Sequence, residues 1–140
     1  MSLTSAFLKL QHRIYEGTGG RVGHKMIGVP TLMLYTTGRK TGQTRNNSLV
    51  YAKDGDDFLL VPSNGGADQA PGWLHNVKAD PAVEVQVRTE RRGGRARVVE
   101  RGDPDFERLW RTVNDNNRGR YDEYQRKTSR QIPIVAVTPS

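Results

Sequence analysis

From residue 28 onward the chain consists mostly of short segments with the residue pattern of β-strands, and this limits the folds open to it. Ala82–Thr89 (AVEVQVRT) alternates strictly, so its valines share one face and its polar residues the other. Similar segments are Val29–Thr37, Ser48–Lys53, Asp57–Ser63, Arg95–Arg101 and Ile132–Thr138. Because these strands do not alternate with helices, a small closed or split barrel is favoured over a doubly wound parallel sheet.

Turn residues separate several of these predicted strands. Asp54-Gly55-Asp56 is typical of a hairpin, and Arg91-Arg92-Gly93-Gly94 predicts a turn before Arg95–Arg101. Pro133 has no backbone N–H to donate, which favours an edge position or a strand end for the last segment.

Helical patterns interrupt the strands only briefly. Pro71–Ala79 predicts a short helix with proline near its first turn. Asp103-Pro104 predicts the N-cap of a second helix, whose apolar stripe is Phe106, Leu109, Trp110 and Val113. A further helical segment is expected from about Tyr121 to Ser129. The predicted fold class is therefore mainly β with flanking helices (α+β).

The N-terminal residues carry a separate pattern. Leu3, Phe7, Leu10 and Ile14 share one face of a predicted amphipathic helix over residues 3–16. A Gly-rich break follows at residues 17–20, so we divide the chain into residues 1–20 and a barrel domain, residues 21–140. The helix either packs on that domain or makes a peripheral membrane contact.

Composition excludes several kinds of site. The chain has no cysteine, which removes disulfides, thiol nucleophiles and thiolate metal centres, and its three histidines have no ligand-like spacing, so we expect no metal. No apolar run is long enough to span a membrane, and a cytoplasmic location is expected. The formal charge of +7 over 140 residues predicts attraction to anions, without saying which.

The stretch TTGRKTGQTR (36–45) is the strongest candidate for an anion site. It combines glycines, hydroxyls and the cations Arg39, Lys40 and Arg45 between two strands. Backbone N–H groups of such a loop approach an anion closely, and the cations supply charge. The spacing is not that of a P-loop. The loop is therefore either a phosphate or carboxylate cradle or a solvated basic loop.

A second Gly-rich stretch, Ser63–Ala67, ends a predicted strand and leads to Trp73. It could hold a flat ring system against backbone amides, with Trp73 as a wall, or be a plain turn beside a core tryptophan. We interpret His75 as an ordinary helix residue rather than a catalytic base. Tyr121 and Tyr124, three residues apart on one helix face, are interpreted as a packing pair. No catalytic triad, carboxylate pair or dinucleotide fingerprint is present. An enzyme of this kind would depend on a bound cofactor.

The order TTGRKTGQTRNNSLVY, VPSNGG, GWLHNVKADPAVEVQV and IPIVAV resembles the deazaflavin-dependent nitroreductase family over about residues 28–138. Members are small actinobacterial reductases that use coenzyme F420. The resemblance implies a split β-barrel of the flavin-reductase, FMN-binding type. It also implies hydride transfer from the reduced deazaflavin to a planar acceptor.

The resemblance also implies site residues. Arg39, Lys40, Thr41 and Arg45 would hold the cofactor's phosphate and polyglutamate tail. The ring and its ribityl chain would lie along Asn46, Asn47, Ser48, Leu49, Val50, Val61, Pro62, Ser63, Asn64, Gly72, Trp73, Leu74, His75 and Asn76. Tyr121 and Tyr124 would face the substrate side, and Ser63 or Tyr121 would supply a proton.

Departures from the family pattern bear on the substrate. Relatives often carry Pro at Thr44 and Lys at Asn64, and the missing lysine removes one cation near the cofactor. Nitroimidazole-reducing relatives carry tyrosines at Val50 and Arg118. A quinone or other planar acceptor is therefore favoured over a bicyclic nitroimidazole.

Other ligands fit parts of the pattern. Related split barrels bind FMN or haem, so the fold alone leaves these open. The stretch 88–101 has six arginines against two glutamates, a net +4, as a nucleic-acid-binding module would. It lacks interleaved aromatics, so we expect no nucleic-acid partner. The sequence does not predict the oligomeric state.

Overall fold

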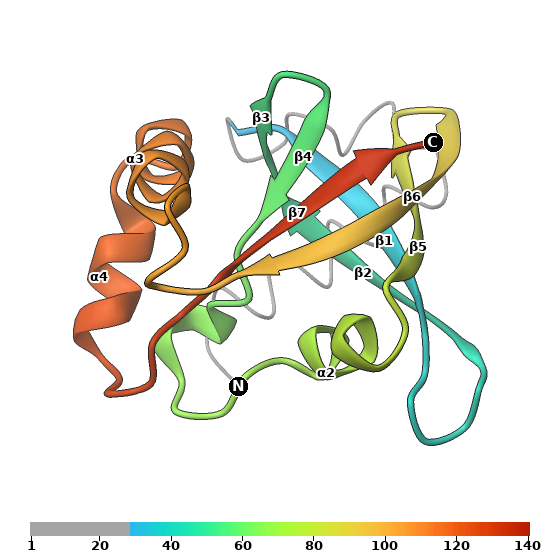
Figure 1. The fold of residues 1–140 in the computed structure, drawn as a ribbon, viewed down its shortest axis with the longest axis horizontal. Coiled ribbons are helices and arrows are strands. Elements are labelled where there is room, and N and C mark those ends of the chain that lie inside the picture. The colour runs from blue at the N-terminus through green and yellow to red at the C-terminus, as the bar shows by residue number, and fades with distance from the viewer. Residues whose placement is uncertain (1–28) are drawn as a thin grey trace.

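The structure is a computed structural model that describes residues 29–140 (Figure 1). Within them the chain forms one antiparallel sheet of strands β1 (Thr31–Thr37), β2 (Thr44–Val50), β3 (Ala52–Asp54), β4 (Asp57–Leu60), β5 (Ala82–Val87), β6 (Glu90–Val99) and β7 (Ile134–Pro139). The helices are α2 (Gly72–Ala79), α3 (Phe106–Asn116) and α4 (Arg120–Arg126), with a 3-10 turn, η2, at Asn64–Gly66. The predicted helix 3–16, the break at 17–20 and the domain boundary at residue 20 lie outside the described residues.

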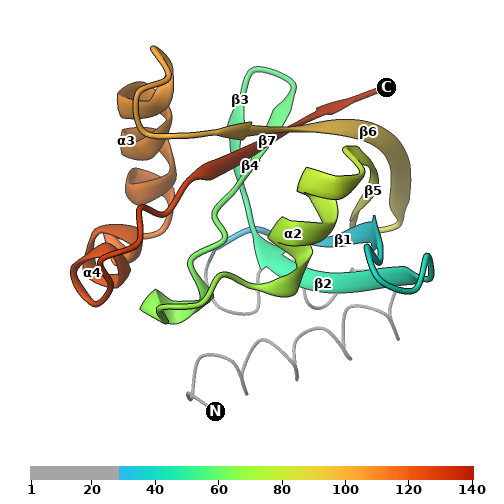
Figure 2. The same cartoon turned by 60° about the horizontal axis from the view of Figure 1, so that its bottom comes forward.

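The sheet curls so that its two edges approach each other at one end. Its strand order is β2-β1-β5-β6-β7-β4-β3, so β2 and β3 are the edge strands. Yet only Tyr51 separates the end of β2 from the start of β3. Because one residue of extended chain spans roughly 3.5 Å, the opposite edges come close together there. The sheet is therefore a split barrel rather than a flat layer, as Figures 1 and 2 show.

Alternating side chains of the strands build a core on each face of the sheet. Leu60, Val135 and Ala96 point toward α2 and join Leu32, Leu34, Trp73 and Val77 in one cluster. Leu59, Ile134 and Val99 point the other way, under α3 and α4. Full burial of each such side chain contributes roughly 1.5–3 kcal/mol. This period of two in β4, β6 and β7 is what makes both faces apolar.

The hairpin between β5 and β6 differs from the prediction. We expected a turn at Arg91–Gly94, but the turn is at Arg88-Thr89, where Arg88 has a φ of 56°. The glycines instead lie inside β6, and a Cβ on Gly94 would come within 2.9 Å of the Thr138 carbonyl oxygen. Gly94 therefore allows a close approach of β6 to β7 rather than a turn.

Two further strand predictions need correction. The segment Ser48–Lys53 is not one strand, because the chain leaves the edge strand β2 at Val50 and enters the opposite edge strand β3 at Ala52. Pro133 does not mark an edge strand: β7 pairs with both β6 and β4. Pro133 directly precedes β7, so the alternative prediction of a strand end is correct.

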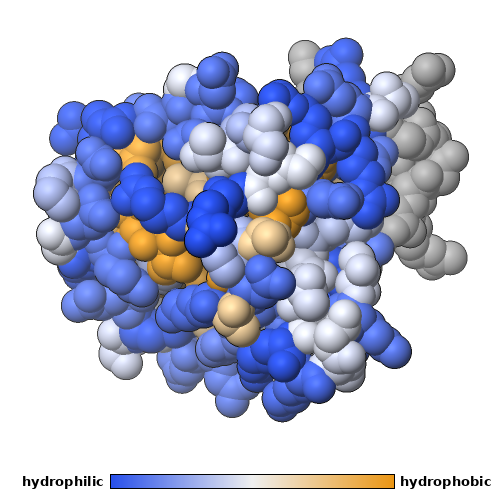
Figure 3. Space-filling view, turned by 45° about the vertical axis from the view of Figure 1, so that its right-hand side comes forward, coloured by the Kyte–Doolittle hydropathy of each residue, from blue (hydrophilic) through white to orange (hydrophobic). Residues whose placement is uncertain are grey.

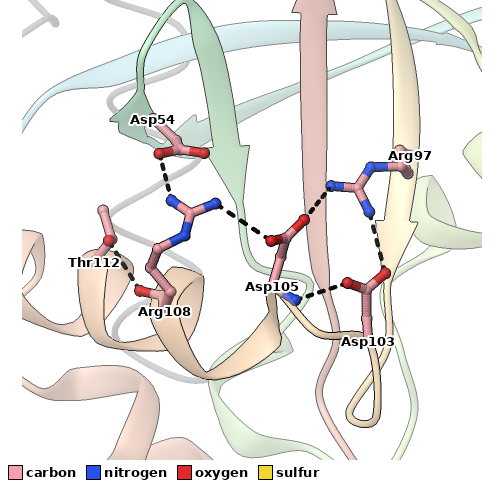
Figure 4. Close-up of polar contacts among 6 residues, drawn as sticks. All are labelled: Asp54, Arg97, Asp103, Asp105, Arg108 and Thr112. Carbon is pink, nitrogen blue, oxygen red and sulfur yellow. Dashed lines mark hydrogen bonds and ion pairs between the residues drawn. The ribbon is translucent and has the colours of Figure 1, made fainter.

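Helix α3 begins two residues later than predicted. Its N-cap is Asp105, and the Asp103 carboxylate accepts a hydrogen bond from the Asp105 N–H at 2.9 Å. The same two aspartates pair with Arg97 on β6, while Arg108 on α3 bonds Asp54 at 2.7 Å (Figure 4). Opposite charges thus join the start of α3 to two strands of the sheet.

Hydrophilic residues dominate the face shown in Figure 3, and apolar residues are recessed between them. Among residues 29–140, no helix is long and apolar enough to cross a membrane.

Candidate functional site

The basic loop is a compact structure rather than an open excursion. Strands β1 and β2 pair as far as Thr37 and Thr44, which leaves residues 38–43 as the connection. The Gly38 N–H donates to the Gln43 carbonyl and the Gly42 N–H to the Gly38 carbonyl, both at 2.8 Å. A Cβ on Gly38 would lie 3.0 Å from the Thr41 hydroxyl. The loop therefore closes tightly on itself at Gly38, and the side chains of Arg39 and Lys40 remain exposed.

Asn76, on α2, ties the loop to the body of the protein. Its Nδ2 donates to Thr36 Oγ1 at 3.2 Å, and its Oδ1 accepts from the Arg39 N–H at 3.1 Å. Asn76 and Thr36 are both buried. A side-chain amide can donate and accept at once, which is what this position requires. The backbone of the loop is thus fixed against the first strand and α2.

A cavity of about 330 Å³ opens between the loop, β2 and α2. The residues that line it are Gly38, Arg39, Lys40, Thr41, Arg45, Asn46, Asn47, Gly72, Trp73 and Asn76. Among these described residues there are three cations and three amides, and none carries a carboxylate. Such a lining attracts anions and offers donors to phosphate or carboxylate oxygens.

Gly72 leaves one wall of this cavity open. A Cβ on Gly72 would meet no atom of residues 29–140 within 4 Å, although Gly72 lines the cavity. Trp73, beside it, is only 4% exposed and belongs to the core, while it also contributes to the cavity wall. The two interpretations of Trp73, as core and as wall, are therefore both correct.

Much of the predicted cofactor set lines this cavity, but not all of it. The lining contains Arg39, Lys40, Thr41, Arg45, Asn46, Asn47, Gly72, Trp73 and Asn76, together with Gly38, which the predicted set lacks. The glycine pattern of the loop was the signal for Gly38. Lying outside the lining are Ser48, Leu49, Val50, Val61, Pro62, Ser63, Asn64, Leu74, His75, Tyr121 and Tyr124. Their part in binding stays a prediction.

Geometry separates some of these residues from the cavity. Leu74 is buried in the core, and His75 is exposed on α2. Ser48 is buried, and its hydroxyl has no hydrogen-bond partner within residues 29–140. Ser48 lies opposite Met33 in the ladder, while its neighbour Leu49 packs against the core on the α2 side. Because strand residues alternate, Ser48 faces away from α2.

The segment Val61–Gly66 follows β4 and turns sharply. Ser63 is buried, and the next three residues have positive φ angles, 47° at Asn64, 65° at Gly65 and 86° at Gly66. For Asn64 this is an uncommon conformation that costs free energy. The segment is thus a specific turn that lies against α4, with Gly66 beside the Tyr124 carbonyl.

The two tyrosines proposed as substrate-side residues belong to an aromatic cluster. Tyr121 is 5% exposed and contacts Trp110 and Tyr124, with ring centroids 6.4 and 6.2 Å away. Burial raises the pKa of Tyr121 far above its ordinary value, against a hydrogen bond from Asn117. A phenol with a raised pKa is a weaker acid, so its role as proton donor stays a prediction without geometric support.

The arginine-rich stretch on β6 is largely paired within the protein. Arg91 bonds Glu84 and lies over the Tyr35 ring at 3.8 Å, and Arg92 lies 3.8 Å from Glu90. Arg97 pairs with two aspartates, as described above. With Arg101, which lies over the Phe106 ring at 5.9 Å, at least four of the six arginines in residues 88–101 have a structural partner. Residues 29–140 contain no group of three His, Asp or Glu placed to hold a metal ion.

A family model matches most of the chain, including every residue that lines the cavity. The family model described as F420H(2)-dependent quinone reductase matches residues 7–139 of the chain. The chain belongs to this family. The match includes the cationic loop, β2 and α2, and it extends across the predicted boundary at residue 20.

Relatives of the family support the assignment. An F420H(2)-dependent quinone reductase of Mycobacterium tuberculosis is 52% identical over 132 residues, 94% of this chain and 89% of the relative. A solved structure of an F420-H2 dependent reductase, FDR-A, is 34% identical, with a TM-score of 0.68 over 77% of this chain and 93% of its own. The predicted resemblance to the deazaflavin-dependent nitroreductase family is confirmed as membership of the F420-dependent reductases, and the matching model is described as a quinone reductase.

A more distant structure shows the fold alone. The haem storage protein HutZ of Vibrio cholerae is 12% identical and has a TM-score of 0.60 over 95% of this chain and 90% of its own. The split β-barrel predicted from the sequence is confirmed by this likeness and by the curled sheet, whose edge strands approach each other at Tyr51.

Proposed function

We propose that this protein binds reduced coenzyme F420 and catalyses hydride transfer to a quinone. The observation that carries the proposal is the cavity beside the loop, which groups Arg39, Lys40 and Arg45 without a carboxylate among the described residues that line it. The cofactor's tail carries phosphate and carboxylate groups, so the donor set fits it. The family description and the names of its relatives support the same cofactor and acceptor.

Different residues would have different parts in binding the cofactor. Arg39, Lys40 and Arg45 would neutralise the anionic tail, and Thr41 and the amides of Asn46 and Asn47 would donate hydrogen bonds to it. Gly72 leaves room beside α2, and Asn76 holds the loop backbone in place. This anchoring would fix the far end of the cofactor and so restrict where its ring lies.

The ring would lie along Val61–Asn64, at the end of β4. When bound, the reduced deazaflavin supplies a hydride, so that a quinone gains two electrons and, with one further proton, becomes a hydroquinone. The backbone N–H groups of Asn64 and Gly65 are the candidate donors toward the charge that develops, because the Ser63 N–H already donates to the Val61 carbonyl at 2.8 Å. Solvent, the Ser63 hydroxyl or, less favourably because of its burial, Tyr121 would supply the proton.

A quinone is the acceptor we favour over a nitroimidazole. Val50 is half-buried and Arg118 is exposed, with a φ of 59°, where nitroimidazole-reducing relatives carry tyrosines. Neither side chain offers an aromatic ring to stack on a bicyclic substrate. The peripheral membrane contact of residues 3–16 and the cytoplasmic location stay predictions.

The test is an acceptor screen with the purified protein. Reduced cofactor is mixed with a soluble quinone, a bicyclic nitroimidazole or no acceptor, and its oxidation is followed by absorbance. We expect rapid oxidation with the quinone and little with the nitroimidazole. Quinone-independent oxidation, or none with any acceptor, would refute the proposed reaction. The absorbance spectrum of bound FMN in the protein as purified would instead indicate FMN as the cofactor.

A further inference from the structure

The segment after β4 is held by a single arginine that lies far along the chain. Arg130 Nη2 donates to the Pro62 carbonyl at 3.1 Å and to the Ser63 carbonyl at 2.9 Å, and its Nε donates to the Ala67 carbonyl at 2.9 Å. The guanidinium thus bonds the start and the end of the turn that contains Asn64–Gly66. Its planar fork suits several acceptors at fixed angles.

Arg130 is itself held in place from α4. The Gln125 side chain donates to the Arg130 carbonyl at 2.7 Å and accepts from the Ile132 N–H at 2.9 Å. A second tie joins the same segments, because Thr128 Oγ1 donates to Asp68 at 2.8 Å. The backbone of Arg130 is therefore fixed, and its guanidinium donates to the turn from a fixed starting point.

The turn needs such support for two reasons. Asn64 has a φ of 47°, a conformation that costs free energy in a non-glycine residue. Gly66 packs so closely on α4 that an added Cβ would lie 2.8 Å from the Tyr124 carbonyl oxygen. The turn is thus shaped by its contacts with residues 124–130 and not by local preference alone.

The Ser63 carbonyl accepts both from Arg130 and from the Gly66 N–H at 2.9 Å, and these bonds together set the direction of an amide. In a planar trans peptide the C=O of one residue and the N–H of the next point opposite ways. With the Ser63 carbonyl directed to Arg130, the Asn64 N–H is directed away from it. Among residues 29–140, no backbone or side-chain acceptor receives a hydrogen bond from this N–H.

We propose that Arg130 is a positioning residue for hydride transfer: it fixes the turn 62–67 and thereby the amides beside the reacting ring. This rests on the proposed function, which places the ring along Val61–Asn64. Arg130 touches neither cofactor nor substrate, and it acts through the backbone of the turn. Lys cannot replace it fully, because an ammonium lacks the fork that bonds three carbonyls at once.

The experiment compares Arg130→Ala and Arg130→Lys with the matched control Arg126→Ala, which removes the same charge from an exposed position on α4. Amide hydrogen exchange of peptides covering 61–68 is measured without cofactor. The dissociation constant of the reduced cofactor, kcat and the quinone KM are measured separately. Thermal unfolding identifies the temperature at which all variants are folded.

For Arg130→Ala we expect exchange in 61–68 to rise at least tenfold and kcat to fall roughly tenfold to a hundredfold, since small misplacements carry such costs. Cofactor affinity should change less than about threefold, because the tail cavity is intact, and it should stay close to that of the control. Arg130→Lys should restore part of both effects, and it keeps the test open if the alanine variant does not fold.

Unchanged exchange in 61–68 would overturn the proposal, and so would faster exchange with kcat at the wild-type value. A loss of melting temperature alone would show a merely structural role and would also overturn it. If the wild-type protein does not oxidise the reduced cofactor, the proposed function fails. The exchange measurement, which uses no cofactor, still decides whether Arg130 holds the turn.

Discussion

The Asn76 side chain holds the backbone of Arg39, with Oδ1 of Asn76 3.1 Å from the Arg39 nitrogen. This bond joins the first turns of α2 to the loop that carries the cations. The core therefore fixes where the anion cavity lies, because Asn76 and its second partner Thr36 are buried.

Asn76 variants should separate stability from anion binding. Asn76→Ala leaves the Arg39 N–H and the Thr36 hydroxyl without this partner, and we expect a loss of about 1–3 kcal/mol in unfolding free energy. Asn76→Asp can still accept from both groups, but it adds a negative charge to the cavity. Its stability should be closer to wild type and its cofactor affinity at least tenfold lower. Denaturant unfolding and cofactor titration measure the two effects.

Asn76→Ala should therefore mainly reduce stability, and Asn76→Asp should mainly reduce cofactor affinity. Equal cofactor affinity in Asn76→Asp and the wild type would contradict an anion at this cavity. A fully stable Asn76→Ala would contradict the anchoring role.

Gly72 variants should test the space beside α2. Gly72→Ala adds a methyl group that meets no atom of the described part of the chain, and we expect it to raise stability by about 0.4–1 kcal/mol by restricting the unfolded chain. Gly72→Leu projects a larger side chain into the cavity and should weaken the cofactor at least tenfold at nearly unchanged melting temperature. Wild-type affinity in the leucine variant would place the cofactor elsewhere. Thermal unfolding and fluorescence titration give both values.

Tyr121 predicts a loss of stability in alkaline solution. Burial raises the pKa of its phenol in the folded protein, whereas the unfolded chain ionises near pH 10. The unfolded state therefore releases the proton first, and the stability present below pH 10 declines as the pH rises beyond it. Tyr121→Phe should lose less stability between pH 8 and about pH 11 than the wild type. Parallel declines in denaturant unfolding would show that Tyr121 does not contribute.

The residue pattern of the strands predicted most of this fold. It could not predict which strands that are distant in the sequence lie next to each other. The alternation in Ala82–Thr89 predicts β5 almost residue for residue, because one face of that strand is buried. Ser48–Lys53 reads as a single strand since Tyr51 suits a strand as well as its neighbours do. Only the curling of the sheet, which brings its distant edges close together at one end, requires the chain to change strands at Tyr51.

Turn chemistry misled the prediction where packing overrides it. Gly93-Gly94 has the composition of a turn, yet Gly94 serves the close approach of β7, while Arg88 takes the positive φ at the actual turn. The loop cations were identifiable because Gly and basic residues together indicate an anion site. Arg130 was not, since a lone arginine near a helix end carries no signal for carbonyls 63 to 68 residues away.

The most direct test of the account is a fluorescence titration of the cofactor at several salt concentrations. It compares the wild type, the double variant Arg39→Ala with Arg45→Ala, and Arg95→Ala, an exposed cation of β6 outside the cavity lining. We predict saturable micromolar binding by the wild type, weaker at high salt. The double variant should bind at least tenfold more weakly, and Arg95→Ala within about twofold of the wild type. No saturable binding, or equal affinity in the double variant and the wild type, would contradict the assignment of the cavity.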